Sequence, residues 1–285
     1  MVDASHPELA ALRGRLPKEA DFEAGMEAAA RLEARFEVEV FDVLPGATNC
    51  LVLLARNETV LRVPLCDEER NEGFRAQLVF SGRGGVEILA YEVETGSVLM
   101  PRIRPGKMLH EVTTDPTEEA RICSGVVRTL DHSPIPGAVL IENWYRPFLE
   151  IEHAEAIPDA LLRQAQRVAV RLLATTLSTR LLHGDLHHYN LLQDGDDWVS
   201  VDPKGVVADP AVEIAAFLRN PCDSLSPTPE IMSARIRTFA EELGYPAARI
   251  RDWGIAHNVL SAWWDEPSQR PRTIATVEAI RSSAI

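Results

Sequence analysis

The stretch that decides the fold is LLHGDLHHYN, residues 181–190, which gathers three histidines, Asp185 and Asn190 within ten positions. It runs into NLLQDGDDWVSVD, residues 190–202, where two apolar-rich runs flank an Asp-Gly turn. This pattern predicts a β-hairpin. Because the start of one strand lies beside the end of its antiparallel partner, we expect Asn190 and Asp202 to be neighbours. Asp185 opens onto the same end of the hairpin.

These three side chains suit one kind of chemistry. Carboxylate and amide oxygens are ligands that Mg²⁺ prefers. A separate carboxylate, five residues before the asparagine, can orient and deprotonate an attacking hydroxyl group. Phosphoryl transfer needs this division of labour, and the spacing Asp185-x-x-x-x-Asn190 matches that of a kinase catalytic loop.

Plainer interpretations of the same residues stay open. Asp202 can cap a turn before Pro203, Asn190 can form a turn, and the histidines can be polar loop residues. A rival function is a metallohydrolase, although such sites usually draw further ligands from distant loops. Its candidate ligands are His183, Asp185, His187 and His188.

Composition limits the class of protein. The chain has 285 residues, 46% of them hydrophobic and 25% charged, which is typical of a globular protein. A net charge of −14 argues against a nucleic-acid binder. The sequence contains no run of about 18 apolar residues, so no membrane-spanning helix is expected. Four widely spaced cysteines predict reduced thiols and a cytoplasmic location.

The hydrophobic pattern predicts an α+β, bilobal architecture. A helix is expected over residues 23–36, and strands with one inserted helix (67–80) follow. We predict a small lobe, residues 1–103, with leading helices and a five-stranded antiparallel sheet, and a larger, mainly helical lobe, residues 104–285. The five strand candidates are residues 37–43, 49–55, 59–65, 86–92 and 97–103.

The loop and the run DPKGVVADPA, residues 202–211, resemble the streptomycin 6-phosphotransferase and hydroxyurea phosphotransferase family, within the aminoglycoside phosphotransferase and protein-kinase-like superfamily. Weaker similarity to the same family extends to residues 30–49, 82–92 and 260–264, so the resemblance covers most of residues 25–265. The resemblance implies a bilobal kinase fold that uses ATP and Mg²⁺. It implies that Asp185 is the catalytic base, that Asn190 and Asp202 hold magnesium, and that His183 braces the loop.

The resemblance also assigns nucleotide-binding segments in the small lobe. LPGATN, residues 44–49, would cover the phosphates, with Thr48 and Asn49 as donors. Residues 99–103 would form the hinge that meets adenine through its backbone. The hinge residues are Leu99, Met100 and Ile103.

One departure from the family pattern is serious. Such kinases hold the nucleotide phosphates with a lysine on the third strand, paired with a helix glutamate, but here Arg62 takes that place. No lysine occurs between Glu37 and Ile103. Arginine keeps the charge and can bind phosphate through two N–H groups. Glu72 is the candidate partner, with Glu69 as second choice. Arg62 is therefore either a phosphate clamp or the sign of a catalytically impaired nucleotide-binding protein.

The acceptor is expected to be a small hydroxylated molecule. A streptomycin-like aminoglycoside carries guanidinium groups, for which acidic and aromatic side chains on the large lobe are suitable. Hydroxyurea or another small metabolite is the alternative and needs no acidic cluster. A plainer interpretation makes the tryptophans core and the acids surface, and the sequence predicts no oligomeric state. The candidate substrate residues are Asp209, Glu213, Asp265, Glu266 and Trp263, beside Trp264.

Overall fold

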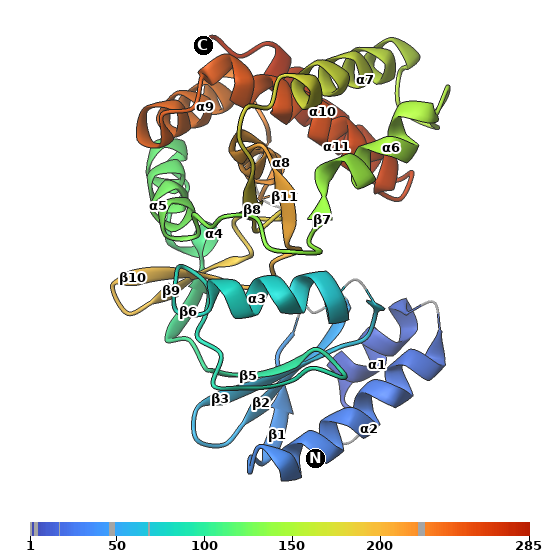
Figure 1. The fold of residues 1–285 in the computed structure, drawn as a ribbon, viewed down its shortest axis with the longest axis vertical. Coiled ribbons are helices and arrows are strands. Elements are labelled where there is room, and N and C mark those ends of the chain that lie inside the picture. The colour runs from blue at the N-terminus through green and yellow to red at the C-terminus, as the bar shows by residue number, and fades with distance from the viewer. Residues whose placement is uncertain (1, 3–4, 17, 46–48, 68, 222–225) are drawn as a thin grey trace. The chain divides into compact units, whose positions relative to one another are not determined.

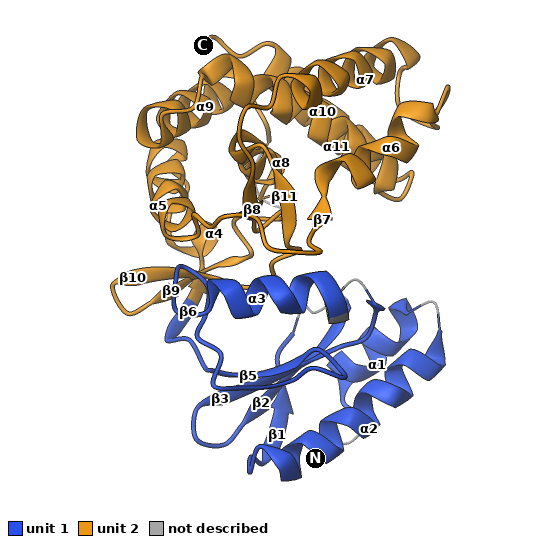
Figure 2. Cartoon of the chain, in the orientation of Figure 1, with its two compact units in different colours: residues 1–106 blue, residues 107–285 orange. Residues whose placement is uncertain are grey.

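The computed structural model of the chain divides into two compact units, residues 1–106 and 107–285 (Figure 2). The division falls three residues after the expected end of the small lobe. Among the described residues, no helix has the length and apolar character needed to cross a membrane. The structure describes residues 2, 5–16, 18–45, 49–67, 69–221 and 226–285.

Unit 1 contains the five-stranded sheet that the sequence predicts. Its strand order is β1-β2-β3-β5-β4, and each neighbouring pair is antiparallel. The π-helix η1 and helix α3 are inserted between β3 and β4, as expected for residues 67–80 (Figure 1). The elements are α1 (Pro7–Arg15), α2 (Glu19–Arg35), β1 (Val40–Val43), β2 (Cys50–Ala55), β3 (Thr59–Pro64), η1 (Glu69–Gly73), α3 (Phe74–Phe80), β4 (Ala90–Glu92) and β5 (Ser97–Pro101).

The two faces of this sheet have different roles. Helices α1 and α2 bury Leu9 and Phe22 in a core that also contains Leu61 and Val63 of β3. Successive side chains of a strand point to opposite faces, so Arg62, between these two residues, points to the other face. Figure 1 shows α3 along that other face. The alternation of β3 therefore keeps a cation out of the apolar core.

A buried carboxylate fastens α2 to the far edge of the sheet. Glu92 of β4 is only 2% exposed and accepts hydrogen bonds from Arg31 and Arg35 of α2. The hydrogen bond from Arg31, helped by Thr95 and by the charges of both arginines, outweighs burial and lowers the pKa of Glu92 from 4.5 to about 2. The ionised form is therefore favoured in the folded protein.

We expect Glu92→Gln to lower the free energy of unfolding by about 1 to 3 kcal/mol at pH 7, because charge-assisted hydrogen bonds to a buried group are lost. A carboxyl group whose pKa is lower in the folded protein than in the unfolded chain stabilises the fold at any pH above the unfolded-chain pKa. This stabilisation is lost as the pH falls from 4.5 toward about 2. The difference from wild type should therefore shrink over that range. Urea unfolding at pH 7 and pH 3.5 measures it, and the exposed Glu94→Gln is the control. A difference independent of pH would contradict this account.

Unit 2 is mainly helical and carries two small sheets, in the orders β10-β9-β6 and β7-β11-β8. Helix α10 is its core element, with Trp253 fully buried and with α7, α8 and α11 packed around it. The elements are β6 (Pro105–Met108, across the unit boundary), α4 (Leu109–Val112), α5 (Pro116–Thr129), β7 (Val139–Leu140), α6 (Ile141–Glu150), α7 (Asp159–Ala174), β8 (Arg180–Leu182), β9 (Leu191–Asp194), β10 (Asp197–Ser200), β11 (Val206–Ala208), η2 (Pro210–Glu213), α8 (Ile214–Arg219), α9 (Pro229–Leu243), α10 (Ala247–Trp264) and α11 (Arg270–Arg281).

Candidate active site

The predicted hairpin is confirmed, and it brings Asn190 and Asp202 to the same end. Strands β9 and β10 pair antiparallel, with Leu191 opposite Ser200. The ladder continues one step further, because Val201 N donates to Asn190 O at 3.0 Å. Asn190 and Asp202 therefore leave the ladder together, at the end where the loop from β8 arrives.

The amide of Asn190 is oriented for cation binding. Its Nδ2 donates to the Asp185 carbonyl oxygen at 2.9 Å, so Oδ1 is the acceptor atom of the side chain. Asp202 has a positive φ of 60°, a conformation that aspartate tolerates better than most residues and that concentrates at functional sites. Its Oδ2 lies 3.1 Å from Nζ of Lys204. One amide oxygen and one carboxylate are a donor set that fits Mg²⁺.

Asp185 is held beside two basic side chains. Its carboxylate is 27% exposed and lies 3.5 Å from Nε2 of His187 and 3.9 Å from Nη2 of Arg219. Burial alone raises the pKa of Asp185, but the charge and hydrogen bond of His187, together with Arg219 and Lys204, outweigh burial and leave the pKa well below its usual range. Asp185 is therefore ionised at neutral pH, as a proton acceptor must be.

His183 lies under the loop with both ring nitrogens engaged. Nε2 lies 2.9 Å from the Val201 carbonyl oxygen, so this nitrogen carries the proton, and Nδ1 accepts from Asp185 N at 3.3 Å. The side chain is fully buried, and this burial lowers its pKa to about 4. The His183 carbonyl accepts from the backbone N–H of Lys204 at 2.7 Å. His183 thus ties the candidate catalytic loop, residues 183–190, to the segment around Asp202, as a bracing residue would.

Glu213 supports the same loop from below. Its two carboxylate oxygens accept from His183 N at 2.7 Å and from Gly184 N at 3.0 Å, and the residue is only 4% exposed. Burial raises its pKa to about 7, against these hydrogen bonds. Gly184 has a φ of +83°, and a Cβ there would lie 3.0 Å from Cγ1 of Val206. Glu213, predicted as a substrate contact, instead orders the backbone that precedes Asp185, because both of its oxygens are used.

The other four predicted substrate residues have different surroundings in the structure and do not form one group. Asp209 caps η2 through Ala211 N and pairs with Arg249, so it is structural. Asp265 accepts from Thr273 at 2.7 Å beyond the end of α10. The remaining two are Glu266, which is exposed, and Trp263, whose ring centroid lies 6.2 Å from that of Phe148.

An aromatic pair beside the catalytic loop was not predicted as a unit. A Cβ at Gly184 would lie 3.3 Å from Cη2 of Trp144, so this ring borders the loop. Trp264, 51% exposed, meets Trp144 edge to face, with ring centroids 5.8 Å apart. His257, buried behind them, has a pKa lowered to about 4 by burial and by Arg219. The sequence signal for Trp264 was present in the WW pair, but nothing linked Trp144 to the loop.

The metallohydrolase interpretation does not fit this geometry. Both nitrogens of His183 bind backbone groups, and His188 is fully buried away from the loop surface. Within the described part of the chain, no group of three or more histidine, cysteine, aspartate or glutamate residues is arranged to hold a metal ion. The described residues therefore do not form the metal site of His183, Asp185, His187 and His188 that this interpretation requires.

In unit 1, Arg62 is 3% exposed and stands opposite Val52 and Val98 in the neighbouring strands. A buried guanidinium requires compensation by an anion. Glu72, its candidate partner, is half-buried on η1. The side chain of Glu69 lies outside the described part, as does Thr48.

The predicted hinge overlaps β5. The Leu99 carbonyl accepts from Leu89 N at 2.8 Å, and Leu99 stands opposite Leu61 in the sheet. Met100 is buried on the same face as Arg62, and Ile103 follows the strand. Ile103 is thus better placed than Leu99 to offer backbone groups. Asn49 has an exposed side chain, and its carbonyl accepts from Leu65 N at 2.8 Å.

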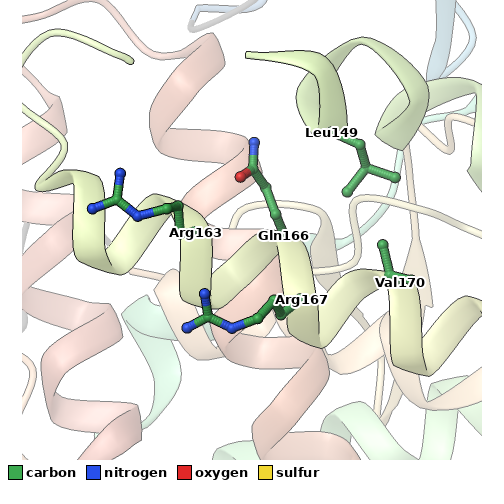
Figure 3. A pocket seen from close by; sticks show the side chains of 5 residues that line it. All are labelled: Leu149, Arg163, Gln166, Arg167 and Val170. Atoms are coloured by element: carbon green, nitrogen blue, oxygen red, sulfur yellow. The ribbon is translucent and has the colours of Figure 1, made fainter. Parts of the chain in front are cut away.

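A separate surface depression lies on α6 and α7, with a volume of 330 Å³ (Figure 3). The amide of Gln166 there donates to the Phe148 and Ile151 carbonyls at 2.8 and 2.9 Å. Its other lining residues include two exposed arginines and no carboxylate or nucleophile. It therefore offers none of the groups found in the catalytic loop.

Comparison with known proteins identifies the family. Residues 42–268 match the aminoglycoside/hydroxyurea antibiotic resistance kinase family. The chain is 30% identical over 216 residues to a streptomycin 3''-kinase from Klebsiella pneumoniae, covering 72% of this chain and 77% of the relative. It is 25% identical over 245 residues to a hydroxyurea phosphotransferase from Kitasatospora aureofaciens, covering 80% and 69%. The chain belongs to this kinase family, and it is a phosphotransferase of small hydroxylated molecules.

Solved structures agree on the fold. A choline/ethanolamine kinase family protein from Mesorhizobium loti superposes with a TM-score of 0.66 at 18% identity, covering 90% of this chain and 93% of the other. An aminoglycoside phosphotransferase APH(4)-Ia, in ternary complex with ADP and hygromycin B, gives 0.62 at 16% identity, covering 90% and 98%. The predicted α+β, protein-kinase-like fold is therefore confirmed.

Proposed function

We propose that the protein is an ATP- and Mg²⁺-dependent kinase that phosphorylates a hydroxyl group of a streptomycin-like aminoglycoside. The observation that carries the proposal is the common placement of Asp185, Asn190 and Asp202 at one end of the β9–β10 hairpin. The names of the streptomycin kinases among its relatives support the acceptor class. We place the reaction in the cytoplasm, where ATP and reduced thiols are available.

Unit 2 supplies the chemistry at the acceptor. Asp185, ionised, accepts the proton of the acceptor hydroxyl as that oxygen forms its bond to the γ-phosphorus of ATP, while the bond from this phosphorus to the β,γ-bridging oxygen breaks and ADP leaves. Asn190 Oδ1 and the carboxylate of Asp202 would hold Mg²⁺, which, when bound, neutralises charge on the nucleotide phosphates. His183 and Glu213 fix the backbone on both sides of Asp185, so little reorganisation is needed during the reaction.

Arg62 of unit 1 is proposed to hold the nucleotide phosphates. We expect Arg62→Ala to raise the KM for ATP by about 10- to 100-fold, since a charge-assisted contact of about 1.5 to 3 kcal/mol is lost. Steady-state kinetics with varied ATP measure the effect. Arg56→Ala, which removes an exposed arginine near the turn between β2 and β3, is the control. An unchanged KM in Arg62→Ala would show that Arg62 is not the clamp.

Arg62→Lys separates a working clamp from an impaired one. Lysine keeps the positive charge but lacks the planar fork. If Arg62 is adapted to this site, the lysine variant should be slower than wild type at low ATP. A clear gain in kcat for the lysine variant would instead identify Arg62 as the cause of impaired catalysis.

The acceptor is proposed to lie against Trp144 and Trp264. An exposed indole can stack on the C–H face of a sugar ring or on a guanidinium group. We expect Trp264→Ala to raise the acceptor KM about 10-fold, with the KM for ATP unchanged, because stacking of this kind contributes about 0.5 to 2 kcal/mol. The fully exposed Leu177→Ala is the control. A changed KM for ATP, or no change at all, would contradict this placement.

A panel of acceptors tests the proposed function directly. Purified protein with ATP and Mg²⁺ is offered streptomycin, other aminoglycosides, choline and hydroxyurea, and phosphate transfer is followed by mass spectrometry. We expect transfer to streptomycin. Transfer to hydroxyurea alone would favour the smaller substrate. Thermal stabilisation by ATP and Mg²⁺ without transfer to any acceptor would favour a silent nucleotide-binding protein.

A further inference from the structure

A fully buried group of charged and polar side chains lies behind the catalytic loop in unit 2. Arg235 of α9, Glu119 of α5 and His188 of the loop are each at most 1% exposed. Arg235 Nη2 donates to Glu119 Oε2 at 2.7 Å and lies 3.1 Å from His188 Nε2. His188 Nε2 lies 3.4 Å from the same glutamate oxygen. Three elements distant in sequence therefore meet at one guanidinium.

Stability alone does not account for such a group. Burying two opposite charges costs about as much as their attraction returns, and an apolar pair of similar size is often at least as stable. Here the cost is increased, because Arg235 Nε, Glu119 Oε1 and His188 Nδ1 are buried and have no hydrogen-bond partner among the described residues. An apolar replacement would lack directional hydrogen bonds, and these bonds fix the positions of the groups that they join.

Besides Glu119, Arg235 binds two segments that lie beside the proposed catalytic base, the loop that carries His188 and the end of α8. His188 lies between Asp185 and Asn190, and its ring stacks on Phe217 with centroids 4.1 Å apart. Arg235 Nη1 donates to the Asn220 carbonyl at 2.7 Å, directly after α8. Helix α8 ends at Arg219, whose Nη2 lies 3.9 Å from the Asp185 carboxylate. One guanidinium thus fixes the loop and the helix end on either side of Asp185.

We propose that Arg235, held by Glu119, is a positioning residue for catalysis: through His188 and the end of α8 it sets the place of Asp185 and Arg219. It does not touch the substrate. The proposal rests on the proposed phosphotransferase function for its rate measurement. The proposal also predicts how firmly residues 183–190 are held, and this can be measured by hydrogen exchange without any acceptor.

The main test compares Arg235→Met with the double variant Glu119→Met/Arg235→Met. The single variant leaves a buried, uncompensated carboxylate and should lose stability, whereas the double variant should regain much of it. If Arg235 positions the loop, kcat should stay about 10- to 100-fold low in both variants, because small displacements of a catalytic group have effects of this size. The KM values for ATP and acceptor should change little. Recovery of kcat together with stability in the double variant would overturn the proposal.

Arg235→Lys supplies a conservative comparison. Lysine can compensate Glu119, but a single ammonium group cannot reach the carboxylate, His188 and the Asn220 carbonyl together. We expect near-normal thermal stability with a kcat between those of wild type and Arg235→Met. Arg171→Met is the matched control, because it breaks another ion pair between helices of unit 2, with Asp252, at 2.6 Å. It should leave kcat unchanged, and a loss equal to that of Arg235→Met would contradict a specific role.

Hydrogen exchange followed by mass spectrometry gives a measurement that needs no acceptor. In Arg235→Met and in the double variant, amides of residues 183–190 should exchange about tenfold faster than in wild type, while β9, β10 and α10 stay protected. Unchanged exchange in the loop would overturn the proposal even if no acceptor were found. Failure of wild type to phosphorylate any acceptor, with faster loop exchange in the variants, would count against the proposed function alone.

Discussion

Asp185→Asn should lower kcat by about 10²- to 10⁴-fold, the usual contribution of a general base, and leave the binding of ATP unchanged. The asparagine keeps the shape of the side chain but cannot accept the proton of the acceptor hydroxyl. Phosphate transfer to the acceptor measures the rate, and stabilisation by ATP and Mg²⁺ in a thermal shift measures binding. Because the pKa of Asp185 is held below its ordinary value of 3.8, the wild-type rate should show no loss from protonation of this carboxylate at any pH above that value.

The hairpin provides a matched control for this substitution. Asp194 is an exposed aspartate at the far end of β9, paired with Asp197 across the turn. Asp194→Asn removes the same charge from the same supersecondary unit and should leave kcat unchanged. Substantial activity in Asp185→Asn, or an equal loss in Asp194→Asn, would show that Asp185 is not the base.

The sequence predicted the elements whose patterns are local. The alternation of residues 59–65 identified β3, and the Asp-Gly turn identified the β9–β10 hairpin, because hydrophobic period and turn chemistry need no distant partner. Strand β11 was missed because it has only three residues, too few to show a periodic pattern. It is a strand through its pairing with β7 and β8. The small sheet exists only through tertiary pairing.

The same distinction applies to the site. Asp185 and Asn190 were found from their spacing along the chain, whereas Glu213 was assigned to the substrate because sequence shows charge but not burial. Only the fold reveals that its oxygens bind the amides of His183 and Gly184. Trp144 was missed for the same reason, because its contact with the loop joins segments forty residues apart.

Asp202→Asn should lower kcat by roughly 10²- to 10³-fold at a fixed magnesium concentration, because a carboxylate ligand is worth several kcal/mol at a metal that stabilises transferred charge. It should also raise the Mg²⁺ concentration needed for half-maximal rate. Asparagine tolerates the positive φ of 60° at this position, so the backbone should be preserved. Titration of the rate with Mg²⁺, after removal of metal with EDTA, measures both effects.

A control and a companion variant decide whether the ion is bound where we propose. Asp197→Asn removes an exposed carboxylate from β10 of the same hairpin and should leave the Mg²⁺ titration unchanged.

Asn190→Ala removes the amide oxygen and also the hydrogen bond to the Asp185 carbonyl, at 2.9 Å, so it should raise the Mg²⁺ requirement and lower kcat together. If two ligands share one ion, their combined loss should exceed either single loss but fall short of the product. Independent, multiplicative effects would mean that the two side chains serve different ions or none.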